Sequence, residues 1–148
     1  MNTEILQKAA NQARGLAIDA IYDKASGHMG LPLGCAEIGA VLYGELLNVN
    51  PAEPRWLNRD RFVLSKGHTA PGLYSTLANR GFFPVEDLKG LRQIGSYLQG
   101  HPNMNTVPGV DMSTGSLGQG VSVAAGMAKA AKFMGKDINV YTLLGDGE

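Results

Sequence analysis

Three histidines are the side chains of this sequence best suited to acid–base chemistry or to binding a polar substrate. His28, His68 and His101 each directly follow a glycine, and each stands in a predicted loop or at the end of a predicted element. A single histidine of this kind is more often a satisfied surface residue than a catalytic one. Three in the same setting favour a shared role, and if they converge we expect them to bind a polar substrate or to exchange protons.

Zinc and disulfide chemistry find no support in the sequence. The histidines form no His-x-x-x-His pair, and the only cysteine is Cys35, so no zinc ligand set is evident. A single cysteine cannot form an internal disulfide, and Cys35 stands in an apolar stretch. We therefore expect a buried core thiol in a reducing compartment.

A glycine-rich segment, residues 114–120, stands directly before a predicted helix. Unpaired backbone N–H groups and the helix dipole at such a place can hold polar or anionic ligand atoms. The segment lacks the Gly-Lys-Ser/Thr of a Walker loop and the spacing of a dinucleotide fingerprint, which argues against a nucleotide-binding protein. The alternative is a helix start that merely packs tightly against a strand.

Asp146 follows a predicted apolar strand and is flanked by two glycines. Its carboxylate would project at the carboxyl end of a sheet, where open α/β sheets bind ligands. One carboxylate in this place suits Mg²⁺ that is also coordinated by phosphate. An ordinary Asp-Gly turn is the alternative.

The elements that must position these residues are helices and strands in alternation. Apolar periodicity, prolines and glycines predict them as follows: helices over 3–24, about 36–47, 70–80, 84–91 and 121–134, strands over 62–64 and 140–144, and an irregular stretch over 95–120. Strands separated by helices predict an α/β fold, a parallel sheet flanked by helices. With 148 residues and 44% hydrophobic content, we expect one domain or part of one.

The balance of charge argues against nucleic acid as a partner. Thirteen basic residues offset thirteen acidic ones, and the one basic cluster, at 55–61, contains Asp60. The first residues lack the basic start and apolar run of a signal peptide, and no run of eighteen apolar residues occurs. We therefore expect a cytoplasmic protein with no membrane partner.

Taken together, these segments resemble the transketolase family. The matching segments occur in the family's order, at 26–34, 59–68, 100–102, 114–120 and 145–148. The sequence looks most like the amino-terminal subunit of two-subunit transketolases, because it reads Leu-Ser-Lys-Gly-His at 64–68 and because Ser116 stands where long transketolases usually have proline. The resemblance implies the diphosphate-binding domain of the thiamine-diphosphate-binding fold over residues 1–148, incomplete at its carboxyl end.

The resemblance also implies an activity and roles for single residues. The activity is transfer of a two-carbon ketol unit from a ketose phosphate to an aldose phosphate, with thiamine diphosphate and Mg²⁺ as cofactors. His28 and His101 would contact hydroxyls of the ketose donor, and His68 would lie against the cofactor. The cofactor would be lined by Gly115, Ser116 and Leu117. Asp146 would be a ligand of Mg²⁺, and Gly147 would approach the diphosphate.

Parts of the family's site are missing from this sequence. Met29 replaces the usual proline after the Gly-His pair, which should loosen that turn. The second Mg²⁺ ligand, an asparagine, would lie beyond Glu148, and the glutamate that activates the aminopyrimidine belongs to the other half of the enzyme. The resemblance therefore implies a homo- or hetero-oligomer with a carboxyl-terminal subunit or half, and we expect no ketol transfer from this chain alone.

Two alternatives stay open at this point. One is another enzyme of the same superfamily, such as deoxyxylulose-phosphate synthase or dihydroxyacetone synthase, although the segments at 65–70 and 100–102 favour transketolase. The other is a cofactor-binding fragment that serves as an interaction protein without catalysis.

Overall fold

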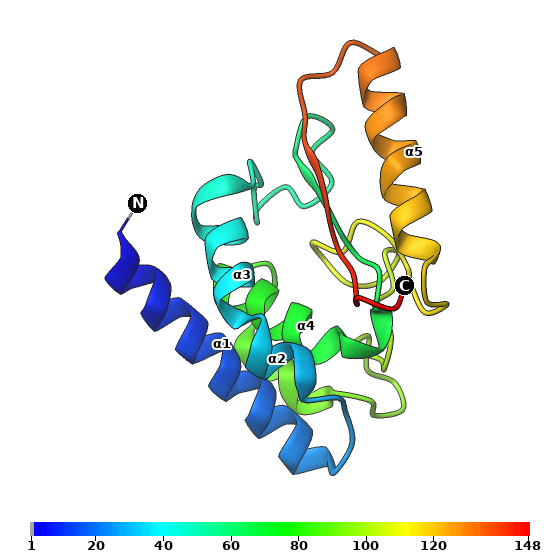
Figure 1. The fold of residues 1–148 in the computed structure, drawn as a ribbon. Coiled ribbons are helices and arrows are strands. Elements are labelled where there is room, and N and C mark those ends of the chain that lie inside the picture. The colour runs from blue at the N-terminus through cyan, green and yellow to red at the C-terminus, as the bar shows by residue number, and fades with distance from the viewer. Residues whose placement is uncertain (1) are drawn as a thin grey trace.

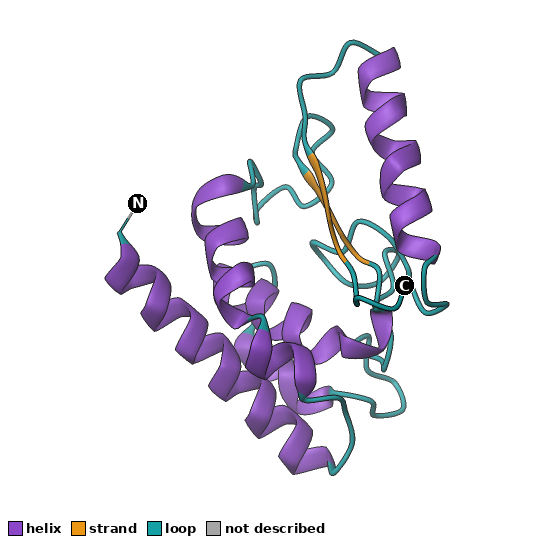
Figure 2. Ribbon diagram, in the orientation of Figure 1, coloured by secondary structure: helices purple, strands orange, loops and turns teal. Residues whose placement is uncertain are grey.

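The computed structural model describes residues 2–148 and shows a helical body beside a small sheet that carries one further helix (Figure 1). The elements in chain order are α1 (Thr3–Lys24), α2 (Gly30–Gly34), α3 (Ala36–Val41), the π-helical turn η1 (Leu42–Leu46), β1 (Arg61–Leu64), the 3₁₀ turn η2 (Gly67–Thr69), α4 (Ala70–Arg80), the 3₁₀ helix η3 (Val85–Gly90), α5 (Gln119–Phe133) and β2 (Val140–Leu143). Helices and loops dominate, and the two strands lie between the helical body and α5 (Figure 2).

The first helix, α1, has the predicted bounds. The side chain of Asn2 accepts a hydrogen bond from the N–H of Ile5 at 3.2 Å and so caps the helix start. The helix ends at Lys24, and its C-cap Ala25 adopts the left-handed conformation with φ 47° directly before the predicted Ser26-Gly27 stop. Within residues 2–148, no helix combines the length and the apolar character needed to cross a membrane.

Helix α4 lies at the centre of the helical body and is buried along nearly its whole length. It packs against α1 and α3, and Gly72 lets the side chain of Leu31 from α2 approach its backbone without a Cβ in the way. The hydroxyls of Ser75 and Thr76 donate to the carbonyl of Gly72 at 3.1 and 2.8 Å, so these buried polar groups are satisfied. Gly81, with φ 95°, ends the helix as predicted.

Strands β1 and β2 pair in parallel, with Arg61 opposite Val140 and Leu64 opposite Leu143. The prediction of a parallel sheet with intervening helices is therefore confirmed for the two strands of the described chain. Because the strands are parallel, the segments that follow them leave from the same edge of the sheet. Residues 65–69 and residues 145–148 are thus neighbours, although most of the chain separates them in sequence.

A buried ion pair fixes the start of β1 and the residues just before it. The guanidinium of Arg59 donates from Nε and Nη2 to Asp111 Oδ1 at 3.0 and 2.7 Å, and Asp111 Oδ2 accepts from the N–H of Phe62 at 2.8 Å. Beside them, Asp60 accepts from the N–H of Asn139 at 2.6 Å, at the start of β2. Arg59 and Asp60 belong to the charged cluster at 55–61, yet they are only 8% and 4% exposed. Both residues are structural.

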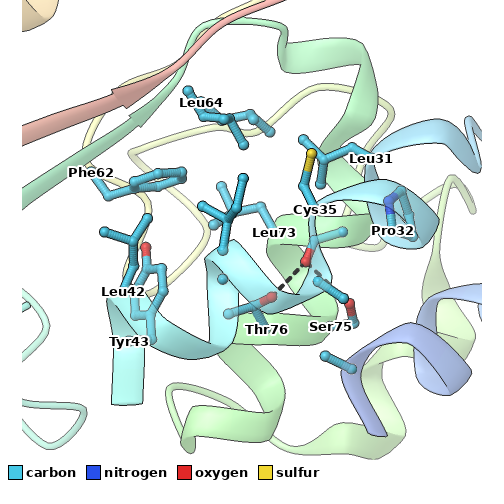
Figure 3. Close-up of a pocket in the computed structure, with 16 residues that line it drawn as sticks. Leu31, Pro32, Cys35, Leu42, Tyr43, Phe62, Leu64, Leu73, Ser75 and Thr76 are labelled. Carbon is cyan, nitrogen blue, oxygen red and sulfur yellow. Dashed lines mark hydrogen bonds between the residues drawn. The ribbon is translucent and has the colours of Figure 1, made fainter. Parts of the chain in front are cut away.

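A small, mostly apolar cavity of ≈20 Å³, partly open to the surface, lies between the sheet and the helices α2, α3 and α4, with Leu31, Phe62 and Leu73 in its wall (Figure 3). This volume holds about one water molecule, and none of the histidines lines it. Cys35 also borders it and packs against the core as expected, although it is only partly buried. The cavity is a packing feature of the core and not the site predicted from the sequence.

Several of the predicted elements differ in the structure. The helix predicted over about 36–47 is α3 followed by the π-helical η1, and the short α2 before it was not predicted. The helix predicted over 84–91 is the 3₁₀ helix η3. Helix α5 begins at Gln119 and not at 121, and β2 ends at Leu143 and not at 144. Pro32 and two glycines hide α2 from periodicity, and Gly39 and Gly44 weaken the helical pattern through α3 and η1.

Replacing Asp111 by Ala should destabilise the protein by about 3–5 kcal/mol, because it leaves the buried Arg59 guanidinium without its counter-charge and the Phe62 N–H without an acceptor. Urea unfolding followed by circular dichroism measures the change. As a control, Glu37→Ala removes the ion pair between Glu37, whose side chain is 50% exposed, and Arg14, whose side chain is 23% exposed. This substitution should barely change the urea concentration at the unfolding midpoint. Equal effects of the two substitutions would contradict a structural role for the buried pair.

Candidate active site

Two of the three predicted histidines are in contact. The rings of His28 and His68 meet edge to face, with centroids 4.9 Å apart and an interplanar angle of 79°. His28 stands in the connection between α1 and α2, whereas His68 stands in η2 directly after β1. The fold therefore joins two Gly-His segments that are far apart in sequence.

The pKa of His68 lies below its usual value of 6.5. Burial of the imidazole is the largest cause, and the neighbouring His28, Lys66 and His101 disfavour a further positive charge, while Glu148 partly opposes them. His68 is therefore a neutral imidazole at neutral pH and can accept a proton. His101 thus lies near enough to His68 to oppose its protonation.

The third histidine is positioned by the buried helix α4. The hydroxyl of Tyr74 lies 2.9 Å from the carbonyl oxygen of Gln99 and 3.0 Å from that of His101, and donates to this stretch of backbone. The ring of His101 lies beside Gly115, whose Cβ, if it had one, would stand 3.5 Å from His101 Cδ2. Burial raises the pKa of Tyr74 above its usual value of 10, so its hydroxyl keeps the proton that it donates.

An open polar cleft of ≈530 Å³ lies beside His101. Its walls come from two loops and the start of α5, and the wall residues that bear on the site are Gln99, His101, Thr114, Gly115, Ser116 and Gln119. Clefts of a few hundred Å³ with convergent polar groups are the usual size and character of small-molecule sites. The predicted glycine-rich segment thus forms a wall of a cleft that can admit a ligand.

The glycine-rich segment, called the glycine loop here (residues 114–120), is fastened to the end of β1. The hydroxyl of Thr114 donates to the carbonyl of Leu64 at 2.6 Å, and Gly67 packs against the carbonyl of Thr114 with no room for a side chain. A Cβ at Gly120 would stand 2.5 Å from the Cα of Ser65. The tight packing that the sequence left as an alternative is present, and it immobilises the loop that borders the cleft.

The exposed part of the glycine loop carries the other two predicted cofactor residues. Ser116 and Leu117 both lie on the surface, and Leu117 is 65% exposed. An exposed leucine next to Ser116, which lines the cleft, offers an apolar contact to a bound group or to another part of the protein.

Asp146 and Gly147 lie in the turn that follows β2, called the aspartate turn here (residues 145–148). Both are exposed, and no atom of the described chain comes within 4 Å of where a Cβ of Gly147 would stand. Residues 2–148 contain no group of three or more metal-ligating side chains, so Asp146 offers a single carboxylate. This donor set fits Mg²⁺ that takes most of its ligands from phosphate and water, and the open glycine leaves space for such a phosphate. Within residues 2–148, no hydrogen bond or ion pair joins Asp146 to the three histidines.

Glu148 joins the segments that border the site, and the sequence did not predict this role. Its carboxylate accepts hydrogen bonds from the N–H of Gly118 at 2.9 Å, the hydroxyl of Ser65 at 3.1 Å and the N–H of Gly145 at 2.8 Å. Burial pushes the pKa of Glu148 upward, but these hydrogen bonds and Lys66 outweigh it and hold the pKa below its usual value. An acidic residue directly after the Gly-Asp-Gly motif was the only signal in the sequence.

The fold and the site together define an α/β domain that gathers polar loops at the carboxyl edge of a parallel sheet, the usual ligand-binding edge of such proteins. The family described as "Transketolase, thiamine diphosphate binding domain" matches residues 5–147. The chain therefore belongs to the transketolase amino-terminal family. The expectations of its fold class and family are confirmed.

Individual relatives agree with this assignment. The chain is 48% identical to the transketolase of Dictyostelium discoideum over 153 residues, which are 96% of this chain and 23% of that protein. The solved transketolase of Campylobacter jejuni superposes with a TM-score of 0.92 at 46% identity, over 99% of this chain and 24% of that one. A Pichia stipitis transketolase, solved as a complex with sedoheptulose 7-phosphate, superposes with a TM-score of 0.91 at 43% identity. The match covers 97% of this chain and 23% of that one. The chain thus spans about a quarter of the length of these relatives.

The imidazole of His68 should titrate with a midpoint below 6.5, and His28→Gln should move that midpoint upward, because the substitution removes a neighbour that opposes protonation. Carbon-bound ring protons followed by NMR across the acidic range measure both midpoints. Since protonation is disfavoured in the folded state, this group costs stability as the pH falls below 6.5. A normal His68 midpoint that does not respond to His28→Gln would contradict the observed contact.

Replacing Gly120 by Ala should cost about 1–3 kcal/mol of stability, because the new methyl group collides with the backbone of Ser65. Thermal unfolding measures the loss. The matched control is Gly126→Ala in the same helix, where no atom lies within 4 Å of the new Cβ, and it should stabilise by up to about 1 kcal/mol through helix propensity. If both substitutions stabilise, the glycine loop is not held by this close approach.

Proposed function

We propose that this chain is the diphosphate-binding part of a transketolase, which transfers a two-carbon ketol unit from a ketose phosphate to an aldose phosphate. The observation that carries the proposal is the contact of His28 with His68 at the sheet edge that also holds the glycine loop and the aspartate turn. Family membership supports the reaction class. The description of the Pichia stipitis relative as a complex with sedoheptulose 7-phosphate supports sugar phosphates as substrates.

Thiamine diphosphate, when bound, supplies the nucleophilic carbon and the electron sink that ketol transfer requires. In this proposal Gly115, Ser116 and Leu117 line the cofactor, and the exposed Leu117 gives it an apolar contact. Asp146 is a ligand of Mg²⁺, and the open space beside Gly147 lets the diphosphate approach its backbone. The description of the family as thiamine diphosphate-binding supports the cofactor, whereas Mg²⁺ rests on the chemistry of the exposed carboxylate.

The three histidines have different roles in this proposal. His68, a neutral imidazole in contact with His28, lies against the cofactor and accepts a proton there. His28 and His101 approach from different loops and bind hydroxyls of the ketose donor. Binding from two sides fixes the donor's orientation relative to His68, and orientation is itself a large part of catalysis.

In this proposal, the site is completed by the part of the enzyme that this chain does not cover, about three-quarters of the length of the relatives. A carboxyl-terminal half or subunit supplies the groups that bind the aminopyrimidine, and it contacts the exposed face of the glycine loop in a homo- or hetero-oligomer. The 148-residue chain, a partial domain, then has no ketol-transfer activity by itself. A cytoplasmic location stays a prediction of the sequence.

The proposal is tested by titrating thiamine diphosphate in the presence of Mg²⁺ into the complete enzyme that contains this chain, with isothermal calorimetry as the readout. Asp146→Asn should weaken cofactor binding by at least about tenfold, because it removes an anionic ligand of the metal. The matched control is Asp137→Asn, an exposed aspartate near the opposite end of β2, which should bind as the wild type does.

Two results would count against the proposal. If the wild-type enzyme binds no thiamine diphosphate, the chain serves another purpose, such as interaction without catalysis. If Asp146→Asn and Asp137→Asn bind the cofactor equally well, Asp146 is not a metal ligand.

A further inference from the structure

We infer that Glu148 is a positioning residue, which fixes the aspartate turn to the glycine loop so that both ends of the cofactor meet a preformed surface. The inference rests on the proposed function, because it takes the loop and the turn to be the two cofactor-binding segments. The role concerns the carboxylate of Glu148 alone, which makes no contact with substrate in this proposal.

The carboxylate of Glu148 accepts hydrogen bonds from three segments of the chain. Oε1 accepts from the N–H of Gly118 and from the hydroxyl of Ser65, and Oε2 accepts from the N–H of Gly145. Gly118 is 30 residues and Ser65 is 83 residues away in sequence, so both contacts depend on the tertiary fold. Glu148 therefore connects the aspartate turn, the glycine loop and the end of β1 at one point.

A carboxylate suits this place better than any neutral side chain. Gly118 is the residue that caps α5, where backbone N–H groups lack partners within the helix and where the helix dipole favours negative charge. Gly118 also adopts φ 82°, and no side chain of its own provides a cap. A hydrogen bond to an ionised acceptor is roughly twice as strong as a neutral one, so Glu148 replaces the missing cap effectively.

Both oxygens of Glu148 act as acceptors, and this makes the role testable with a small change. Glutamine keeps the length and shape of the side chain but offers one acceptor oxygen, so its NH₂ group must face the N–H of either Gly118 or Gly145. Glu148→Gln therefore breaks the connection at one end, whereas Glu148→Ala breaks it at all three contacts. Ser65→Ala removes only the hydroxyl contact and should have the smallest effect.

The experiment uses the complete enzyme and two readouts. Amide hydrogen exchange without cofactor should become faster in residues 114–120 and 145–148 in Glu148→Gln, and faster still in Glu148→Ala. The apparent dissociation constant for thiamine diphosphate should rise by about tenfold in Glu148→Gln, as expected when a hydrogen bond that orients a binding group is lost. The KM for the sugar phosphates and kcat at saturating cofactor should stay close to those of the wild type.

Glu86→Gln is the matched control, because Glu86 is an exposed carboxylate in η3 and outside the cleft. It should change neither the exchange nor the affinity. A loss of kcat at saturating cofactor together with unchanged affinity would overturn the inference, since it would make Glu148 part of the chemistry. Unchanged exchange in both Glu148 variants would overturn it as well.

Tighter cofactor binding by Glu148→Ala would also overturn the inference, because it would mean that the carboxylate occupies the place of the diphosphate. Failure of the proposed function has a different signature. The wild-type enzyme would then bind no thiamine diphosphate, while the exchange measurement would still report whether Glu148 holds the two segments together.

Discussion

The close approach of two backbone segments is the constraint on which the rest of the site depends. The turn after β1 and the glycine loop lie so near each other that Gly67 and Gly120 have no space for a side chain. The hydroxyl of Thr114 adds a hydrogen bond to the carbonyl of Leu64 across the same junction. His68, the loop that borders the cleft and the start of α5 are therefore held in one rigid arrangement, because close-packed backbones leave little freedom for adjustment.

A second connection links this edge of the sheet to the core. Helix α4 begins directly after His68, and its Tyr74 reaches the backbone at Gln99 and His101 from within the helical body. One helix thus positions two of the three histidines, the first through the chain itself and the other through a hydrogen bond. Its burial among α1, α2 and α3 means that the core and the site share the same structural support.

The sequence predicted those parts of the structure that depend on local pattern. The periodicity of α1, the glycine stop of α4 and the apolar runs of both strands were sufficient, whereas α2, η1 and η3 were missed or misjudged, because prolines and glycines obscure short or non-α helices. The repeated Gly-His segments predicted convergence, and the rings of His28 and His68 do meet. Asp111 and Glu148 could not be predicted, because their partners are 52 residues away in one case and 30 and 83 in the other.

The late position of β2 in the chain has a consequence for synthesis on the ribosome. The first eighty residues contain α1 and α4, which pack against each other, so this body can assemble while the rest of the chain is still being made. Strand β1 emerges early too, but its hydrogen-bonding partner β2 follows only after α5. An unpaired apolar strand can pair with a strand of another chain. We therefore expect β1 to be open to such mispairing in the nascent chain until β2 has been synthesised.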